Sequence, residues 1–476
     1  MKHVQEGGAS IAAVEVRRER AAPWGLVGLA SAMLSGSLGT SIVNVALPKL
    51  AATFGAPFEA VQWIVIAYLL TSTAVIVVVG RLGDAVGVRR LLLGGLLSFG
   101  TASVACGLAP SLPVLIALRA VQGIGAAVLM ALTVALARSV VGKERTGSAM
   151  GLLGTMSAIG TALGPSLGGA MLATLGWRAV FFANVPLTLL SFALTWRHLP
   201  PDRERVAATP ERFDRAGAAL LAATLASFAF AATARDGGAW RLVSGIVALV
   251  GAVAFVAVEK RAASPLLPLS LLRDRGLGGA LITNTVVSTV MMATLVVGPF
   301  HLVHALGLDA GRAGLVMSIG PAVSALIGVP AGRLVDRVGV RRVTIAGLLG
   351  VVVGTGAVAA LAGHTTVLSY VAPLAVTTGS YALFSAANNT AVMADASAAR
   401  RGMLSGLLSL SRNLGLMTGA TVLGSVFAVA CGTIDVAEAP RDVIAAALRT
   451  TFTAASSLVG AVALFAALRG NREVSS

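Results

Sequence analysis

The stretch GRLGDAVGVRR, residues 80–90, returns 252 positions later as GRLVDRVGVRR, residues 332–342, with nine of its eleven letters unchanged. Each of these two repeat stretches follows a long apolar run and precedes another. A second pair of stretches, RTGSAMGLL at 145–153 and RRGMLSGLL at 400–408, repeats at an offset of 255. Because two separate matches share nearly the same offset, the sequence predicts a duplicated structural unit.

The composition is typical of a membrane protein. Of the 476 residues, 56% are hydrophobic and 12% are charged, whereas soluble domains carry about 25% charged residues. The net charge of +16 makes a nucleic-acid-binding protein the alternative. However, the basic residues lie in short clusters between apolar runs, so we expect no nucleic-acid partner. Cys106 and Cys431 have neither metal-ligand spacing nor a disulfide framework, and we expect no metal and no cofactor, with an ion gradient as the energy source.

A transmembrane helix needs about 20 apolar residues, and fourteen runs reach this length. They are residues 24–48, 58–81, 90–109, 112–138, 146–174, 177–196, 214–233, 240–258, 277–303, 311–332, 342–362, 366–393, 402–430 and 444–468. Aligning the repeats pairs the first six runs with the last six and leaves two runs as an insertion. We therefore predict an all-α integral membrane protein with two pseudo-symmetric six-helix bundles and two inserted helices.

The expected domain boundaries follow from this alignment: an N-terminal tail at 1–23, a first bundle at 24–198, a linker with the inserted helices at 199–262, a second bundle at 263–469 and a C-terminal tail at 470–476. Lysine and arginine concentrate in cytoplasmic loops. If both tails are cytoplasmic, that side holds 27 of the 36 basic residues. We therefore expect a multi-pass protein of the cell membrane with both termini in the cytoplasm, acting as a monomer in the lipid bilayer.

Several motifs together resemble the major facilitator superfamily of transporters. The first repeat stretch is similar to its loop signature, RAVQGIGAA at 119–127 to its fourth-helix motif, and GTALGPSLGG at 160–169 to the fifth-helix motif of antiporters. The stretches that match the fourteen-helix drug/proton antiporter branch are SIVNVALP at 41–48, QWIVIAYLLT at 62–71, GWRAVFFANVP at 176–186 and PLLPLSLLRDR at 265–275.

The resemblance covers nearly the whole chain and implies a secondary transporter that exports a small amphipathic compound by alternating access, coupled to protons. Parallel repeats are themselves a transporter architecture. We expect no enzyme activity, because the sequence has neither a nucleophile elbow nor a phosphate-binding glycine loop. A facilitative carrier without ion coupling is the alternative.

The repeat stretches are candidates for a cytoplasmic gate, which is what the resemblance implies. Glycine permits a tight turn, an aspartate can pair with a nearby arginine or cap a helix, and arginines at headgroup level anchor the topology. The alternative is a purely structural turn. The candidate gating residues are Gly80, Asp84, Gly87, Arg89, Arg90, Asp336, Arg341 and Arg342.

Small residues line one face of the expected helix 146–174. Gly160, Gly164 and Gly168 are spaced four apart, so a neighbouring helix can approach closely. Pro165 leaves a backbone carbonyl without its usual donor and can bend the helix. Helix packing alone is one interpretation, and a flexible seal in the first bundle is the one that the resemblance implies.

Arg119 lies inside the expected helix 112–138, where burying an arginine costs about 2.5–3.5 kcal/mol unless it faces polar groups. The resemblance places it beside a central cavity with a role in proton coupling, whereas hydrogen bonding to backbone carbonyls is the structural alternative. Polar and methionine residues of other expected helices could complete this cavity, although a membrane asparagine also serves as interhelical glue. The candidate cavity residues are Asn44, Tyr68, Arg119, Gln122, Asn284, Met292, Tyr381, Ser385, Asn388 and Arg412.

One position departs from the pattern of the branch. Its members typically carry an aspartate five residues before the asparagine of VNVALP, where this chain has Gly39. Proton-coupled carriers usually titrate a carboxylate in the cavity. The sequence leaves three explanations: an unusual coupling group, a neutral or anionic substrate with Arg119 and Arg412 as counter-ions, or no coupling. His301 and His304 titrate in a suitable range, although two interfacial histidines without a role are the simpler interpretation.

We predict that Asp84→Asn slows transport without preventing membrane insertion, because a gating contact loses its charge while the turn keeps its shape. Asp336→Asn should have a smaller effect, since Val335 stands where the first repeat stretch has a glycine. Uptake rates by membrane vesicles, normalised to the amount of inserted protein, measure both effects. Unchanged transport by Asp84→Asn at normal expression would leave only the structural interpretation.

Overall fold

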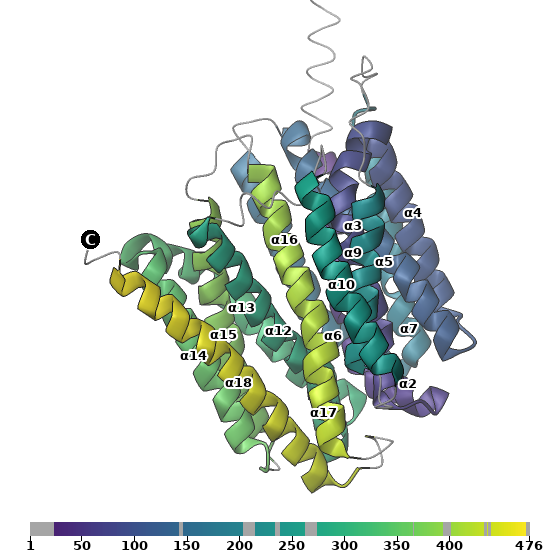
Figure 1. The fold of residues 1–476 in the computed structure, drawn as a ribbon. Helices are drawn as coiled ribbons and strands as arrows, with labels where there is room; N and C mark the ends of the chain where they lie inside the picture. Colours follow the sequence, from purple (N-terminus) through teal and green to yellow (C-terminus); the bar gives the residue numbers. More distant parts are fainter. Residues whose placement is uncertain are drawn as a thin grey trace, which may run out of the picture.

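The computed structural model describes residues 23–141, 146–202, 215–233, 239–261, 274–364, 366–393, 401–432, 436 and 439–472, and these contain helices and no strand (Figure 1). Thirteen of the described helices are long and apolar enough to cross a membrane. The remaining expected run, 146–174, falls on the 29-residue helix α6 (Thr146–Thr174). The predicted all-α membrane architecture is therefore confirmed.

The first half of the protein begins with the spanning helix Pro23–Phe54, which contains the 3-10 turn η1 (Asn44–Ala46) and ends in α2 (Leu47–Phe54). Its other helices are α3 (Phe58–Val86), α4 (Val88–Gly107), α5 (Leu112–Val141), α6, α7 (Trp177–Phe182) and α8 (Asn184–His198). The expected single run 177–196 is thus two helices, which meet at Ala183.

The second half contains α12 (Arg275–Phe300), η2 (His301–Ala305), α13 (Ala310–Val338), α14 (Val340–Leu361), α15 (Val367–Met393), α16 (Arg401–Thr418), η3 (Gly419–Leu423), α17 (Gly424–Cys431) and α18 (Arg441–Arg472). Both η2 and η3 are single π-helical turns inside longer spans. Such turns widen a helix locally and are frequent at functional sites.

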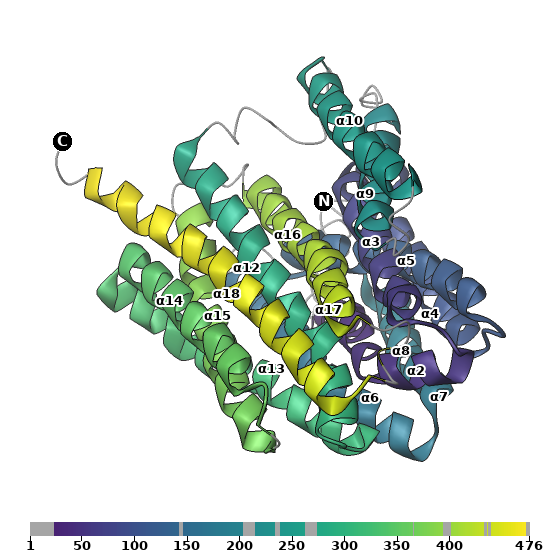
Figure 2. The ribbon, with the colours of Figure 1, turned by 60° about the horizontal axis from the view of Figure 1, so that its bottom comes forward.

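The inserted helices α9 (Arg215–Thr233) and α10 (Ala239–Arg261) pack against each other at the side of the first half (Figure 2). The side chain of Trp63 on α3 donates from Nε1 to Thr233 Oγ1 at 3.2 Å. Helix α10 lies outside α9 and exposes most of its apolar side chains. These two helices add surface to the first half and contribute no residue to the central cavity described below.

The repeat stretches are helical corners, each with a tight turn at a single glycine. Residues 80–86 continue α3, residues 88–90 begin α4, and only Gly87 lies between them. In the second stretch Gly339 alone separates α13 from α14. Both glycines have positive φ, 104° and 94°, a conformation that L side chains rarely adopt. We call the end of the molecule that contains these two corners the corner end, and the opposite end the far end.

Each corner is tied to the last helix of its own half. Arg89 donates to the carbonyl of Trp196 on α8 at 2.5 Å, and Arg341 donates to the carbonyl of Ala467 on α18 at 3.5 Å. The first corner has an additional cap, because the carboxylate of Asp202 accepts the backbone N–H groups of Arg89 and Arg90 at 2.9 and 3.1 Å. Negative charge at a helix N-terminus is favourable.

The structure describes the side chains of only some of the candidate gating residues. The side chain of Asp84, like residue Gly80, lies outside the described side chains. Asp336 and Arg342 are exposed. The cap by Asp202 was not predicted, because nothing in the sequence links residue 202 to a turn more than a hundred positions earlier.

The two corners make a matched pair for mutation. Gly339→Ala should cost roughly 1–2 kcal/mol, because a Cβ disfavours positive φ while nothing lies near the new methyl group. Gly87→Ala should cost more, because its methyl group would also overlap the carboxylate of Asp202. Thermal unfolding of the purified protein in detergent measures both. An equal loss of stability in the two variants would show that the Asp202 cap contributes nothing at the first corner.

Candidate functional site

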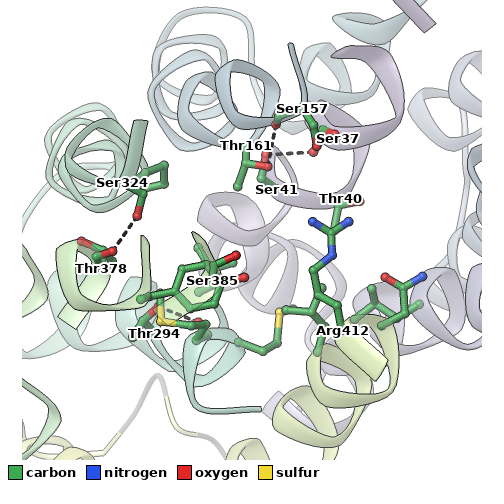
Figure 3. Close-up of a pocket in the computed structure, with 18 of the residues that line it drawn as sticks. Ser37, Thr40, Ser41, Ser157, Thr161, Thr294, Ser324, Thr378, Ser385 and Arg412 are labelled. Atoms are coloured by element: carbon green, nitrogen blue, oxygen red, sulfur yellow. Dashed lines mark hydrogen bonds between the residues drawn. The ribbon is translucent and has the colours of Figure 1, made fainter. Parts of the chain in front are cut away.

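A cavity of about 290 Å³ lies between the two halves, at the middle of the spanning helices (Figure 3). The first spanning helix, α3, α5 and α6 line it from the first half, and α12, α13, α15 and α16 line it from the second. The duplicated unit therefore builds one central site from both of its copies, as in transporters with parallel repeats.

Glycine faces fix the position of the two helices nearest this cavity. Gly160 and Gly164 of α6 abut Ser37 and Ser41 of the first spanning helix. At the equivalent places of the second half, Gly415 abuts Ser288 and Gly419 abuts Met292. A methyl group at any of these four glycines would overlap the partner helix. The predicted close approach at the α6 glycines is thus confirmed, and it recurs in the second half.

Both halves line the cavity with hydroxyl groups, but they differ in the apolar and charged side chains that they add. The wall from the first half carries hydroxyl groups, contributed by Ser37, Thr40, Ser41, Ser157 and Thr161. Ser37 Oγ lies 2.8 Å from Ser157 Oγ, and Ser41 Oγ donates to the carbonyl of Gly160 at 3.2 Å. The second half adds further hydroxyl groups, including those of Ser324, Thr378 and Ser385, and most of the thioether and alkyl groups, from Met291, Met292, Leu295, Met317 and Leu416. We call the first side the hydroxyl wall and the second side the methionine-rich wall. Methionine adapts to irregular apolar ligands, so the cavity suits an amphipathic compound.

Arg412 is the only charged side chain among the described residues of the cavity wall. It lies on α16, is partly buried, and forms no hydrogen bond or ion pair with a described residue. In Figure 3 its guanidinium group points across the cavity towards Thr40. The equivalent position in the first half is Ser157, which bonds to a neighbouring helix.

Arg119 does not reach the cavity. Its side chain is 1% exposed and stacks on the ring of Tyr68. The Cζ atom of Arg119 lies 4.2 Å from the centroid of that ring. Its Nε donates to the carbonyl of Ile64 at 3.0 Å, and one terminal nitrogen donates to the carbonyl of Gly39 at 3.2 Å and to Gln122 Oε1 at 2.5 Å. Carbonyls, an amide and an aromatic ring therefore stabilise this buried charge, which is the structural alternative that the sequence left open.

The space of the missing carboxylate at position 39 is filled. A Cβ on Gly39 would lie 2.8 Å from the ring of Phe99 and 3.5 Å from the hydroxyl of Tyr68. Tyr68 itself donates to the carbonyl of Gly36 at 3.1 Å. An acid would therefore project between Phe99 and Tyr68, beside Arg119, and in this chain the aromatic ring takes its place.

At the far end the halves meet in two pseudo-symmetric contacts. Gly314 of α13 lies against Gly169 and the carbonyl of Pro165 on α6. At the equivalent positions, Gln62 of α3 lies against Gly424 and donates to the carbonyl of Ala420.

The rings of Phe58, Phe300 and Phe427 close the same end of the molecule. The centroid of Phe58 lies 4.8 Å from that of Phe300 and 5.6 Å from that of Phe427. Since Phe58 belongs to the first half and the other two to the second, this cluster joins the two halves at the far end.

Comparison with known proteins agrees with this geometry. Residues 29–420 and 280–475 match the sequence profile of the Major Facilitator Superfamily. The chain belongs to that superfamily. It is therefore a multi-pass membrane transporter and not an enzyme.

Two relatives and one solved structure show the range of this similarity. The chain is 32% identical to multidrug resistance protein Stp of Mycobacterium tuberculosis, over 82% of its own length and 73% of that protein. It is 29% identical to riboflavin transporter RibZ of Clostridioides difficile, over 82% and 85%. A bacterial homologue of the human lysosomal transporter Spinster, solved in an inward-facing and unoccupied conformation, superposes with a TM-score of 0.70 at 16% identity, over 94% and 96%. The resemblance to the drug-exporting branch is thereby confirmed.

Of the ten candidate cavity residues, the structure brings five together in the wall: Tyr68, Met292, Tyr381, Ser385 and Arg412. The remaining five lie behind it: Asn44, Arg119, Gln122, Asn284 and Asn388. The asparagines show why helical spacing did not predict which polar side chains line the cavity. Asn44 donates to the carbonyls of Thr40 and Ser41, and Asn284 donates to the carbonyl of Leu408 and to Ser411 Oγ, so both connect backbone within or between helices.

The two histidines of η2 also lie outside the wall. His301 is buried with its ring 5.7 Å from that of Tyr370, and His304 stacks on Phe300 at 6.1 Å. The hydroxyl wall was missed because serine and threonine in a membrane helix usually bond to their own backbone. The repeat would have revealed Ser157, since it aligns with Arg412.

The contact at Gly314 predicts a test of the far-end seal. Gly314→Ala should force α13 away from Pro165 and spread the far ends of the two halves, because its methyl group would overlap that carbonyl. Gly311→Ala, one helical turn earlier, is the control, since its methyl group would approach only the Asp309 side chain and, at 3.7 Å, Ala173.

Spin labels at the exposed residues Leu175 and Leu368, one in each half, report the separation of the far ends. The label distance should lengthen in Gly314→Ala and stay unchanged in the control. The same distance in both variants and the unaltered protein would exclude this contact as part of the seal.

Proposed function

We propose that this transporter exports a small amphipathic compound across the cell membrane by alternating access. The observation that carries the proposal is the central cavity, which combines hydroxyl groups from both halves with a methionine-rich surface from the second half. Such a site binds a molecule that has both a polar and an apolar part. The multidrug resistance proteins among its relatives support the same conclusion.

The direction follows from the distribution of charge. Basic residues favour the cytoplasmic side, and the corner end carries Arg89, Arg90, Arg341 and Arg342. We therefore infer that the corner end and both termini face the cytoplasm and that the sealed far end faces outward. In this arrangement the cavity loads from the cytoplasm or the inner leaflet. Opening of the far-end contacts, with closure at the corners, would release the compound outside.

The coupling ion is open to two interpretations. Membership in a drug/proton antiporter branch favours proton coupling. Against it, Gly39 and Phe99 occupy the place of the expected acid, and no described acidic residue lines the cavity. The second candidate function is therefore an uncoupled or differently coupled carrier of a neutral or anionic metabolite, which the position of Arg412 in the wall favours.

Everted membrane vesicles distinguish these candidates. Vesicles with the chain should accumulate a fluorescent amphipathic dye faster than vesicles with the Gly314→Ala variant, because that variant cannot seal its far end. A proton antiporter should respond to an acidic vesicle interior when the membrane potential is held at zero. Accumulation that ignores this pH gradient would favour the second candidate, and equal uptake by vesicles with and without the chain would contradict transport of that dye altogether.

A further inference from the structure

We propose that the cavity is a binding site for an amphipathic organic anion, whose charged group lies between Arg412 and the hydroxyl wall. The apolar body of the ligand then packs on the methionine-rich wall. This inference rests on the proposed function only in taking the cavity as the substrate site. It adds the charge of the substrate and the way in which that charge crosses the membrane.

The first argument is the electrostatic imbalance of the site. Arg412 has no acidic partner among the described residues, and Arg119, which packs on the wall residue Tyr68, is also positive. Arg119 lies over the ring of Tyr68, which itself lines the cavity. At an effective dielectric constant of about 20 the interaction of two charges is about fourfold stronger than in water. The site therefore repels a cation and attracts an anion.

The second argument is the broken symmetry between the halves. In the first half Ser157 bonds to Ser37 and completes the contact between two helices. In the second half the equivalent of Ser37 is Ser288, which is buried and whose hydroxyl has no hydrogen-bond partner among the described residues. Arg412 stands at the equivalent of Ser157 and turns into the cavity instead. No described residue accepts a hydrogen bond from its guanidinium, whose five donors can therefore serve a ligand.

The third argument concerns the geometry of the opposite wall. Arg412 points towards Thr40, and Ser37, Ser41, Ser157 and Thr161 lie beside it (Figure 3). Thr40, Ser41 and Thr161 donate to backbone carbonyls in this structure, and each hydroxyl can rotate to donate to an oxyanion instead. A carboxylate, sulfonate or phosphate ester between these groups would receive charge-assisted hydrogen bonds from the guanidinium and neutral ones from the wall.

The charge of the ligand then decides how transport is driven. Among the described residues, the titratable groups of the cavity wall are Arg412 and three tyrosines, Tyr68, Tyr370 and Tyr381, with His301 against Tyr370. None of them is a carboxylate that could exchange a proton for the ligand. The anion therefore carries its own charge across the membrane, and a membrane potential that is negative inside drives it outward.

Binding tests the site directly. Three probes share a naphthyl-butyl body and end in a sulfonate, an alcohol or a trimethylammonium group, so none changes its charge between pH 6 and 8. The purified protein should bind the sulfonate at least about tenfold more tightly than the alcohol, and the ammonium least tightly. Arg412→Ser, which installs the residue of the symmetric position, should remove the preference for sulfonate, while Arg412→Lys should retain only part of it. Arg449→Ser, at an exposed site on α18, is the charge-matched control.

Transport measurements test the proposal that the anion carries its own charge across the membrane. In proteoliposomes, sulfonate uptake should follow a potential that is positive inside, with an accumulation ratio of about tenfold for each 60 mV, and should not respond to a pH gradient at constant potential. Tighter binding of the ammonium probe, or sulfonate binding that survives Arg412→Ser, overturns the anion site and leaves alternating access intact. Sulfonate uptake driven by pH alone overturns the electrogenic step. Arg412-dependent binding without transport of any probe supports the anion site and contradicts the proposed export.

Discussion

Close contact between helix backbones is the constraint on which this structure depends. Lipid tails are as apolar as leucine side chains, so helices in a membrane gain little by hiding apolar surface from their surroundings and associate mainly through tight packing. Gly160 and Gly164 in one half, and Gly415 and Gly419 in the other, provide that packing. The helices they hold carry Ser41 and Met292 into the cavity. The position of the site therefore depends on residues that have no side chains.

The duplication preserves this backbone contact and changes the chemistry around it. Gln62 and Gly314 occupy equivalent places at the far end, yet one bridges the halves with an amide and the other with its bare backbone. A transporter needs contacts that break during each cycle. One hydrogen bond within a membrane contributes about 1 kcal/mol, so a seal built from a few such contacts opens without a large barrier. Two tightly interlocked side-chain surfaces would be harder to separate.

The architecture was predictable from the sequence because it depends on periodicities that are long and repeated. Apolar runs define the spans, and the offset of the repeat stretches defines the two halves. The direction in which a side chain points was harder to predict. Asn284 and Asn388 lie on spans that line the cavity, but a rotation of a helix by one residue is about 100°, which is enough to turn a side chain from the wall into a helix contact. The cap by Asp202 and the position of Phe99 over Gly39 were also hidden, because each depends on a neighbour far away in the sequence.

Arg119 and Arg412 show how two identical side chains acquire different roles in one membrane protein. The carbonyls of Gly39 and Ile64 can accept from Arg119 because glycine at position 39 lets the helices approach and leaves the carbonyl accessible. These acceptors and the ring of Tyr68 hold the charge in place. Arg412 has no such set of acceptors among the described residues, and its place in the cavity wall would let water solvate its guanidinium until a ligand replaces that water. A guanidinium that is solvated in the empty site and paired in the loaded one binds an anion by exchange of partners, and it binds most strongly when the cavity is closed to water at both ends.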